Sequence, residues 1–411
     1  MGFQLLSSFL FLGVVIVSCF GELSLSNTFL DDNSIKLVSN DGLRDEQHST
    51  YSIIDDDHDL DDFSNGRIGR HCIKAIYQFG DSISDTGNFI WEDPYSSFGQ
   101  FPYGETYFQK PTGRCSDGRL MIDYLAKFLK LPFLEPYLNK EGNFEHGANF
   151  AVIGATALDV STLVAKDIIP SVTNHSLSVQ LGWFKSHINS IYSDTSECKR
   201  KLAKALFIVG EIGGNDYNFA ISVGKQPPFL YQMVPEVVQA ISNVTEELIS
   251  LGATQLIIPG NFPVGCMTVY LAGFKSNDPS MYDDLKCLIS LNEFAKFHND
   301  QLRQTIKKLR KKHPHVAIAY MDLDKAMRKM LQHATSLGFK KKVMYKACCG
   351  SGDDDNYNFN SSAICGIPGV RACQSPQKHV SWDGFHLTDR AYQVMTTWLI
   401  SHIFDGTSTF S

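Results

Sequence analysis

The chain has 411 residues, of which 43% are hydrophobic and 20% are charged, and its formal net charge is −7. This length and composition are typical of a globular protein with a sizeable core, and the negative charge argues against a nucleic-acid-binding protein. Beyond the N-terminus, no stretch approaches the roughly 20 apolar residues of a membrane helix. We therefore expect neither nucleic-acid binding nor integral membrane association.

The N-terminus carries an apolar run from Leu5 to Phe20 that ends in small residues. The run is too short for a membrane helix and is typical of a signal peptide, which predicts removal of residues 1–21 on secretion. An oxidising compartment also suits the ten cysteines and gives meaning to the glycosylation motifs at Asn174, Asn243 and Asn360. The predicted location is extracellular or in another compartment reached by the secretory pathway.

Residues 22–70 differ in composition from the rest of the chain. Between Asp31 and Asp62 there are eleven acidic residues against two basic ones. Such a segment buries too little apolar surface to offset the entropy of ordering it, so we expect disorder. It ends in the pattern Arg67-Ile68-Gly69-Arg70, which indicates an acidic propeptide removed by a protease; an uncleaved solvated tail fits equally well.

From Ile73 onward, short apolar runs alternate with segments of helical periodicity. Helical spacing runs from Leu291 to Leu309 and again after Thr388, a candidate N-cap. This alternation predicts a parallel sheet with helices on both faces, in one domain over residues 71–411. The predicted strands are Ala75–Phe79, Ala205–Val209, Thr254–Ile258 and Val316–Tyr320.

Two segments at opposite ends of the chain carry candidate catalytic groups. Ser82 lies in Gly80-Asp81-Ser82, directly after a predicted strand, where open α/β sheets bind their ligands. Asp383 and His386 lie three residues apart before a predicted helix. His386 could act as the base, and Asp383 could orient its imidazole ring. Taken alone, Ser82 could simply shape a turn, and the Asp383–His386 pair could be a helix cap or two metal ligands.

Two further segments could stabilise negative charge on a substrate oxygen. Gly147–Ala155 and Gly213-Gly214-Asn215-Asp216 each follow or contain a predicted strand. The backbone N–H groups of Ser82 and Gly154 and the side-chain amide of Asn215 would form a three-donor oxyanion hole. Gly147 is the alternative donor to Gly154.

Together and in this order, these four segments resemble the plant GDSL esterase/lipase family of the SGNH-hydrolase superfamily. The strings Phe101–Thr106, Thr112–Leu120, Pro259–Cys266 and Cys348-Cys349-Gly350 are similar to its acetylajmalan-esterase and sinapine-esterase branch. The resemblance implies a three-layer α/β/α sandwich around a mostly parallel five-stranded sheet. It also implies a Ser82, Asp383 and His386 triad with oxyanion donors from Ser82, Gly154 and Asn215.

The chain departs from the family pattern at two places. Ile83 replaces the leucine of the family name, which leaves the serine untouched. Relatives commonly carry a cysteine about six residues before the position of Cys198, where this chain has Tyr192, so we expect Cys198 to be unpaired. Proximity favours a disulfide between Cys266 and Cys287 and pairing among Cys348, Cys349, Cys365 and Cys373, with the connectivity open. No C-x-x-C occurs, so zinc binding is disfavoured.

The resemblance predicts a secreted serine ester hydrolase that acts on an acylated plant metabolite or a short-chain lipid ester, without a cofactor. In a plant, the secretory pathway would deliver it to the apoplast or the vacuole. A serine-dependent acyltransferase, for example one moving hydroxycinnamoyl groups, would use the same residues. A non-catalytic binding or defence protein is the third alternative. The aromatic stretch Trp91–Phe108 could line a substrate pocket or pack as a lid, and the basic run Lys307–Lys312 is interpreted as a solvated helix end.

Overall fold

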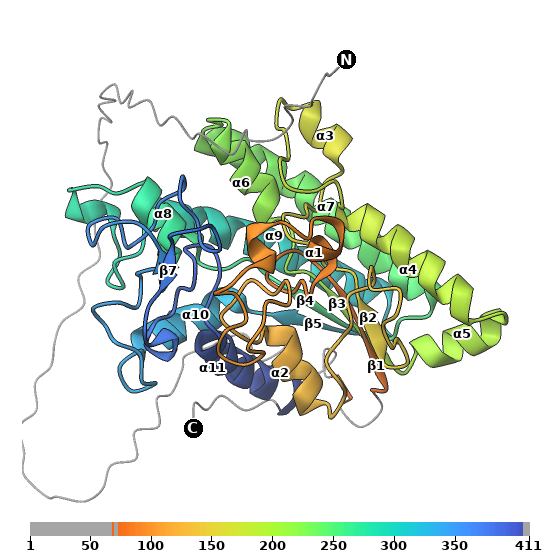
Figure 1. Cartoon of the computed structure of the whole chain (residues 1–411). Coiled ribbons are helices and arrows are strands. Elements are labelled where there is room, and N and C mark those ends of the chain that lie inside the picture. Colours follow the sequence, from red (N-terminus) through yellow and green to blue (C-terminus); the bar gives the residue numbers. More distant parts are fainter. Residues whose placement is uncertain (1–67, 70–72, 406–411) are drawn as a thin grey trace, which may run out of the picture.

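The computed structural model of the protein describes residues 68–69 and 73–405 (Figure 1). The predicted signal peptide, the acidic segment up to residue 67 and Arg70 lie outside the described residues. Ile68 is buried in the core and Gly69 N–H donates to the Gln255 side chain at 2.9 Å, so packing of the domain includes residues just before the expected boundary at 71.

The centre of the molecule is a sheet of five parallel strands in the order β2-β1-β3-β4-β5. Each of the four predicted strands is found within one residue of its expected bounds. The fifth strand covers only three residues of the small, apolar segment predicted between 147 and 155. The strands are β1 (Ala75–Phe79), β2 (Gly147–Asn149), β3 (Ala205–Val209), β4 (Gln255–Pro259) and β5 (Ala317–Met321).

Helices cover both faces of this sheet, as Figure 1 shows. Alternate strand residues point to opposite sides, so Tyr77 and Phe79 pack with α4, α7 and α9, whereas Ile76 packs with α2, α10 and α11. These helices are α2 (Met121–Phe128), α4 (Leu177–Ile191), α7 (Pro227–Leu251), α9 (Ile289–Lys312), α10 (Leu323–Gln332) and α11 (Asp389–Ile400). The three-layer α/β/α sandwich is therefore confirmed.

Both helices that the sequence predicted are present. Thr388 accepts a hydrogen bond from Ala391 N–H at the start of α11, which confirms the N-cap. The run Lys307–Lys312 forms the last turns of α9, and Lys312 pairs there with Glu246, as expected for a solvated helix end. Within the described residues, no helix combines the length and apolarity that crossing a bilayer requires.

Shorter elements lie around the sheet and shape its carboxyl edge. They are α1 (Asn88–Glu92), α3 (Val160–Val164), α5 (Thr195–Leu202), α6 (Gly214–Ser222), α8 (Thr268–Gly273), the two-stranded hairpin of β6 (Cys349–Gly350) and β7 (Arg371–Ala372), and a terminal π-helical turn, Ser401–Asp405. Single 3₁₀ turns occupy Ser97–Gly99, Val264–Cys266, Pro279–Met281 and Pro376–Lys378.

Three disulfides staple the segments that follow β4 and β5. Cys266 bonds Cys287, as predicted, and the open pairing among the other four cysteines is Cys348–Cys373 and Cys349–Cys365. Two cysteines of the described residues are unpaired, the half-buried Cys198 and the fully buried Cys115. The prediction for Cys198 is confirmed, whereas Cys115 was not anticipated.

Candidate active site

The candidate site lies at the carboxyl edge of the sheet, between β1 and β3. The strand order reverses direction at this point, and α/β sheets of this order bind ligands in the resulting crevice. Ser82 is in the loop after β1, and Asn215 is in the first turn of α6, after β3. The loop that leads into α11 brings His386 to the same edge, 304 residues from Ser82 in sequence.

Ser82, His386 and Asp383 form a continuous chain of hydrogen bonds. Ser82 Oγ lies 2.8 Å from His386 Nε2, and His386 Nδ1 lies 2.7 Å from Asp383 Oδ2. These separations are within the range in which an imidazole can take a hydroxyl proton and a carboxylate can orient the imidazole. The structure therefore brings together the three side chains that the sequence singled out, in the order nucleophile, base and acid.

The Asp383 carboxylate is held by its own loop. Its Oδ1 accepts the backbone N–H groups of Phe385 at 2.9 Å and His386 at 2.8 Å. Burial acts to raise the pKa of Asp383, but the facing imidazole and these hydrogen bonds outweigh it, so the pKa lies below its usual value. Gly384 has φ of +101°, and a Cβ there would lie 2.3 Å from the Phe359 ring, so this turn requires glycine.

Two backbone donors near Ser82 are free. Among the residues that the structure describes, no oxygen accepts from the N–H groups of Ser82 or Gly154. Asp85 connects their two loops, because its Oδ2 accepts from Ile153 N–H at 3.0 Å while its Oδ1 accepts from Gly87 and Asn88 at the start of α1. Buried donors without an acceptor are rare in proteins, so these two N–H groups are available to a substrate oxygen.

Gly154 itself is constrained to glycine. Its φ is +78°, and a Cβ at this position would lie 2.6 Å from the side chain of Val172. Gly147, the alternative donor considered from the sequence, is the first residue of β2, and a Cβ there would lie 1.9 Å from the Ile76 carbonyl oxygen. Gly147 N–H donates to Phe144 O at 3.1 Å. Gly147 therefore serves the packing of two strands, and Gly154 is the better candidate donor.

The Asn215 amide reaches the same crevice with both hydrogens engaged. Its Nδ2 donates to Ala155 O at 3.0 Å and to Asp81 Oδ2 at 3.2 Å. The next residue, Asp216, accepts from the N–H groups of Ala157 and Leu158 at 2.8 and 2.9 Å, which ties α6 to the loop after β2. The amide is thus fixed beside Gly154 and Ser82, and one of its bonds must be exchanged before it can bind a substrate oxygen.

Three buried carboxyl groups lie behind these donors. Burial, followed by repulsion from the Asp81 charge, raises the pKa of Glu211 well above its usual value, and burial also raises the pKa of Asp81. Burial raises the pKa of Asp216 to about 7. Carboxyl groups this close cannot all ionise, so protons are retained in the cluster and little negative charge faces the crevice.

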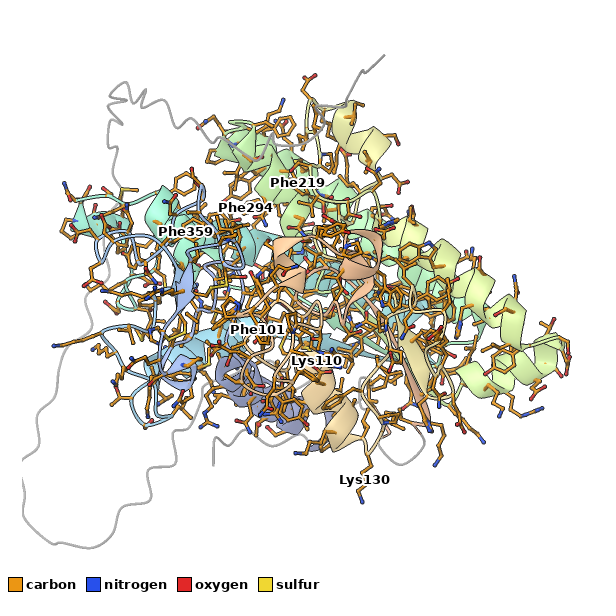
Figure 2. All side chains as sticks on the ribbon, viewed as in Figure 1. Phe101, Lys110, Lys130, Phe219, Phe294 and Phe359 are labelled. Atoms are coloured by element: carbon orange, nitrogen blue, oxygen red, sulfur yellow. A yellow bond between two sulfur atoms is a disulfide. The ribbon has the colours of Figure 1, made fainter. Side chains whose placement is uncertain are left out.

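Aromatic rings surround the catalytic histidine candidate. Phe98 meets the His386 ring edge to face at 6.3 Å, and Phe359, labelled in Figure 2, packs against Phe385 at 5.5 Å between ring centres. Within the stretch Trp91–Phe108, Phe98 is partly buried and Tyr103 is buried at the site. Trp91, Tyr95 and Phe101 are exposed. The stretch therefore serves partly as packing behind the triad and partly as exposed apolar surface.

Comparison with known proteins decides the family. The family model for GDSL-like lipases and acylhydrolases matches residues 76–399. The chain is 45% identical over 336 residues to a GDSL esterase/lipase of Arabidopsis thaliana, covering 80% of this chain and 86% of that protein. It is 43% identical to sinapine esterase of Brassica napus, over 78% and 84% of the two chains. It is also 42% identical to acetylajmalan esterase 2 of Rauvolfia serpentina, over 80% and 90%.

The chain belongs to the GDSL-like lipase/acylhydrolase family. It is a hydrolase of ester bonds, as its sequence predicted, and its small-molecule substrate is an ester. The family model spans β1 to α11 and so includes all five positions that the resemblance assigned.

One group of side chains in this GDSL family member has the proximity of potential metal ligands. Among the described residues, Cys348, Cys373 and His379 place one ligand atom each within 4.8 Å of one another. Both sulfurs are joined in the Cys348–Cys373 disulfide. The oxidised pair offers no thiolate, so these residues do not fit a zinc site.

The sequence analysis missed several side chains that build the site. Asp85 lies three residues after Ser82, and Asp216 ends the segment Gly213–Asp216, but their buried hydrogen bonds depend on contacts between distant loops. Glu211 carried no motif signal. Tyr103 was noted only as part of Phe101–Thr106, and its hydroxyl contacts Asp383 across 280 residues of sequence. Of these, only Asp85 and Asp216 could have been singled out, as acidic residues beside predicted strand ends.

Proposed function

We propose that this ester hydrolase works through an acyl-enzyme formed on Ser82. The observation that carries the proposal is the hydrogen-bonded chain Ser82–His386–Asp383 beside two free backbone donors. His386 takes the Ser82 proton as Oγ attacks the ester carbonyl, and Asp383 holds the imidazole and stabilises its protonated form. The protonated His386 then gives the proton to the leaving alcohol.

The negative charge on the tetrahedral intermediate needs donors in place before the reaction. The N–H groups of Ser82 and Gly154 supply two, and the Asn215 amide supplies a third when it exchanges its 3.2 Å bond to Asp81 for the substrate oxygen. A water molecule activated by His386 hydrolyses the acyl-enzyme in the reverse sequence. An alcohol in its place would give acyl transfer, so the ratio of products with and without an added alcohol distinguishes hydrolase from transferase.

The test of this mechanism is Ser82→Ala, with Ser84→Ala as its matched control. Ser84 lies in the same loop, but its hydroxyl accepts from Gln78, whereas the hydroxyl at His386 is that of Ser82. We expect Ser82→Ala to lower kcat by several orders of magnitude and Ser84→Ala to leave most of it. Retention of a tenth of the wild-type kcat in Ser82→Ala would exclude Ser82 as the nucleophile.

We further propose that the substrate is an ester of a plant metabolite. Two relatives are named for such compounds, a sinapine esterase and an acetylajmalan esterase. The exposed apolar residues near the site, including Phe385, Val172 and Trp91, suit a substrate with an apolar or aromatic part. Hydrolysis of a panel that varies the acyl group and the alcohol separately, against short-chain lipid esters, would test this choice.

Secretion and glycosylation belong to the same proposal. Three disulfides join cysteines of the described residues, which suits an oxidising compartment, and Asn174, Asn243 and Asn360 are all exposed. Residues 1–21 would be the signal peptide and 22–70 a propeptide or tail. N-terminal sequencing of the protein from its native tissue gives a start near His71 if the propeptide is removed and near Glu22 if it is retained.

A further inference from the structure

Tyr103 adds a fourth side chain to the Ser82–His386–Asp383 chain. Its hydroxyl donates to Asp383 Oδ2 at 2.8 Å, the same oxygen that lies 2.7 Å from His386 Nδ1. This single carboxylate oxygen therefore accepts from both groups, while Oδ1 is occupied by two backbone N–H groups of its own loop. The Tyr103 hydroxyl and the His386 imidazole therefore share one acceptor atom, Asp383 Oδ2.

The fold holds the Tyr103 ring in place from several sides. Only 1% of the residue is exposed, and its ring packs against Phe98 at 5.5 Å and Trp382 at 6.1 Å between ring centres. Cys348, Cys349 and Cys365 complete this cluster. The loop that carries Tyr103 runs from Phe101 past Lys110, both labelled in Figure 2, and Gly104 N–H anchors it to Ser116 O at 2.9 Å. Such packing leaves the hydroxyl one direction in which to point.

We propose that Tyr103 is a positioning residue that holds the Asp383 carboxylate in line with His386 and limits how strongly it attracts the imidazole proton. The inference rests on the proposed function, because it assumes that His386 is the base. A hydroxyl that donates to a carboxylate stabilises its charged form and makes it a weaker acceptor for other donors. Without it, Asp383 would hold the imidazolium more tightly.

Tyr103 remains a neutral donor wherever the enzyme works. Burial, followed by the adjacent Asp383 charge, raises the pKa of its phenol well above the usual value, so it does not ionise near neutral pH. The other titratable groups around the pair are Asp81 from the loop after β1, Cys115 from the loop before α2, and Tyr392 from α11. None of these donates a hydrogen bond to Asp383 among the contacts of the described residues.

The test is Tyr103→Phe, which removes one oxygen and keeps the buried ring. We expect the acid limb of the kcat/KM–pH profile to move upward by about 0.5 to 1 pH unit, because a stabilised imidazolium loses its proton at higher pH. On the plateau, kcat should fall about three- to tenfold with KM nearly unchanged, since the carboxylate has lost one of its fixed contacts. Melting curves recorded in parallel show whether the variant is folded.

Tyr124→Phe is the matched control. Its hydroxyl also donates to an aspartate, Asp389 Oδ1 at 2.5 Å, but that aspartate lies in α11 and does not contact His386. We expect this variant to leave the pH profile unchanged. An acid limb in Tyr103→Phe that stays in place, or that moves to lower pH, would overturn the inference even if kcat fell.

A double substitution separates this inference from the proposed mechanism. In an Asp383→Asn background the carboxylate that Tyr103 acts on is gone, so adding Tyr103→Phe should change the residual kcat/KM by less than about twofold. A full additive loss would mean that Tyr103 acts by another route. If Ser82→Ala remained active, the proposed function would fail; if Ser82→Ala were inactive and the profile of Tyr103→Phe did not move, only this inference would fail.

Discussion

At the scale of single residues, the site is organised by which polar groups already have partners. The Asn215 amide donates both of its hydrogens to acceptors within the protein. The backbone N–H groups of Ser82 and Gly154 have no acceptor among the described residues. In the proposed mechanism the two backbone donors can donate to an oxyanion as they stand, whereas the Asn215 amide first has to exchange one of its hydrogen bonds. The bond to Asp81 is the longer of the two and the easier to exchange.

This difference leads to a prediction for Asn215→Ala. If the amide turns to the oxyanion as charge develops, its removal should lower kcat by roughly 10²–10³ and change KM little, because the contact forms mainly in the transition state. Steady-state kinetics on one soluble ester provide the measurement. Asn218→Ala is a useful control, since Asn218 donates to Asn215 Oδ1 and lies one turn further along α6. An effect of Asn215→Ala on KM alone would instead place the amide in substrate binding.

The buried Glu211 leads to a second prediction, which concerns how the free energy of unfolding depends on pH. Glu211 retains its proton in the folded protein, since burial raises its pKa well above the value it has in an unfolded chain. The folded state then binds more protons than the unfolded state at intermediate pH, so the stability that Glu211 contributes is present in acid and is lost as pH rises above about 4.5. The glutamine of Glu211→Gln is neutral at every pH. Between pH 5 and 8 this variant should therefore lose less free energy of unfolding than the wild type, by on the order of 1–3 kcal/mol.

Thermal melting of the wild type and of Glu211→Gln between pH 5 and 8 tests whether the wild type loses more stability as the pH rises. His187 and His298 act in the opposite direction, because burial lowers the pKa of each to about 4, but they are present in both proteins and their contribution cancels in the comparison. Glu236→Gln, at an exposed position paired with Lys166, should follow the wild-type curve. Parallel curves for wild type and Glu211→Gln would show that Glu211 is ionised in the folded protein.

At the scale of elements, a short disulfide-bonded hairpin contacts the loop that carries Asp383. Cys348 N–H donates to Ser381 O at 3.1 Å and Cys349 N–H donates to Trp382 O at 2.7 Å, so the β6–β7 hairpin braces the residues just before Asp383. The Cys348–Cys373 bond closes 25 residues of chain and Cys266–Cys287 closes 21, so chain entropy alone predicts a similar stabilisation of about 3 kcal/mol from each.

We therefore predict that paired Cys→Ser substitutions separate stability from activity. Removing Cys348–Cys373 and removing Cys266–Cys287 should lower the melting temperature by similar amounts. At a temperature where both variants are folded, only the first should lose activity markedly, about tenfold or more, because it loosens the support of Asp383. Equal activity in the two folded variants would show that the hairpin has no part in holding the triad.

Local sequence patterns predicted the central strands and the candidate site positions, but not the side chains whose roles arise from burial or from contacts between distant loops. Central strands such as Ala205–Val209 were located because they are short apolar runs with clear ends, and α11 because Thr388 marks its start. The triad positions came from motifs that each stay within a few residues. Tyr103 and Glu211 were not found, because the role of Tyr103 arises from a contact between residues 280 apart in sequence and that of Glu211 from burial, which no local pattern reports.

At the scale of the whole molecule, the residues that match the family model carry the candidate site and most of the cysteines. The family model begins inside β1 and ends one residue before the last residue of α11, so the whole match lies within the part of the chain that the structure describes. Ile68 packs into its core although it precedes the expected cleavage point after Arg70. Cleavage there would remove a buried side chain, so N-terminal sequencing bears on stability as well as on maturation.

The cysteines of the described residues lead to the last prediction, which concerns which thiols react with a labelling reagent. Among the residues that the structure describes, six cysteines form the three disulfides, Cys198 is half-buried and unpaired, and Cys115 is unpaired with no exposed surface. Burial raises the pKa of both free thiols, that of Cys115 far more. A thiol reacts as its thiolate and must be reached by the reagent, so Cys198 should label slowly in the native protein and Cys115 should not label at all.

Unfolding without reduction should expose both thiols at once. Peptide mapping after labelling in denaturant should then find the label on Cys198 and Cys115 and on none of the six bonded cysteines. Label on Cys266 or Cys287 would contradict the disulfide between them, and label on Cys115 in the native protein would mean that the core behind the triad opens. Cys198→Ser should keep nearly full activity, because the proposed acyl transfer uses no thiol and Cys198 lies on α5, at the opposite end of β3 from the site.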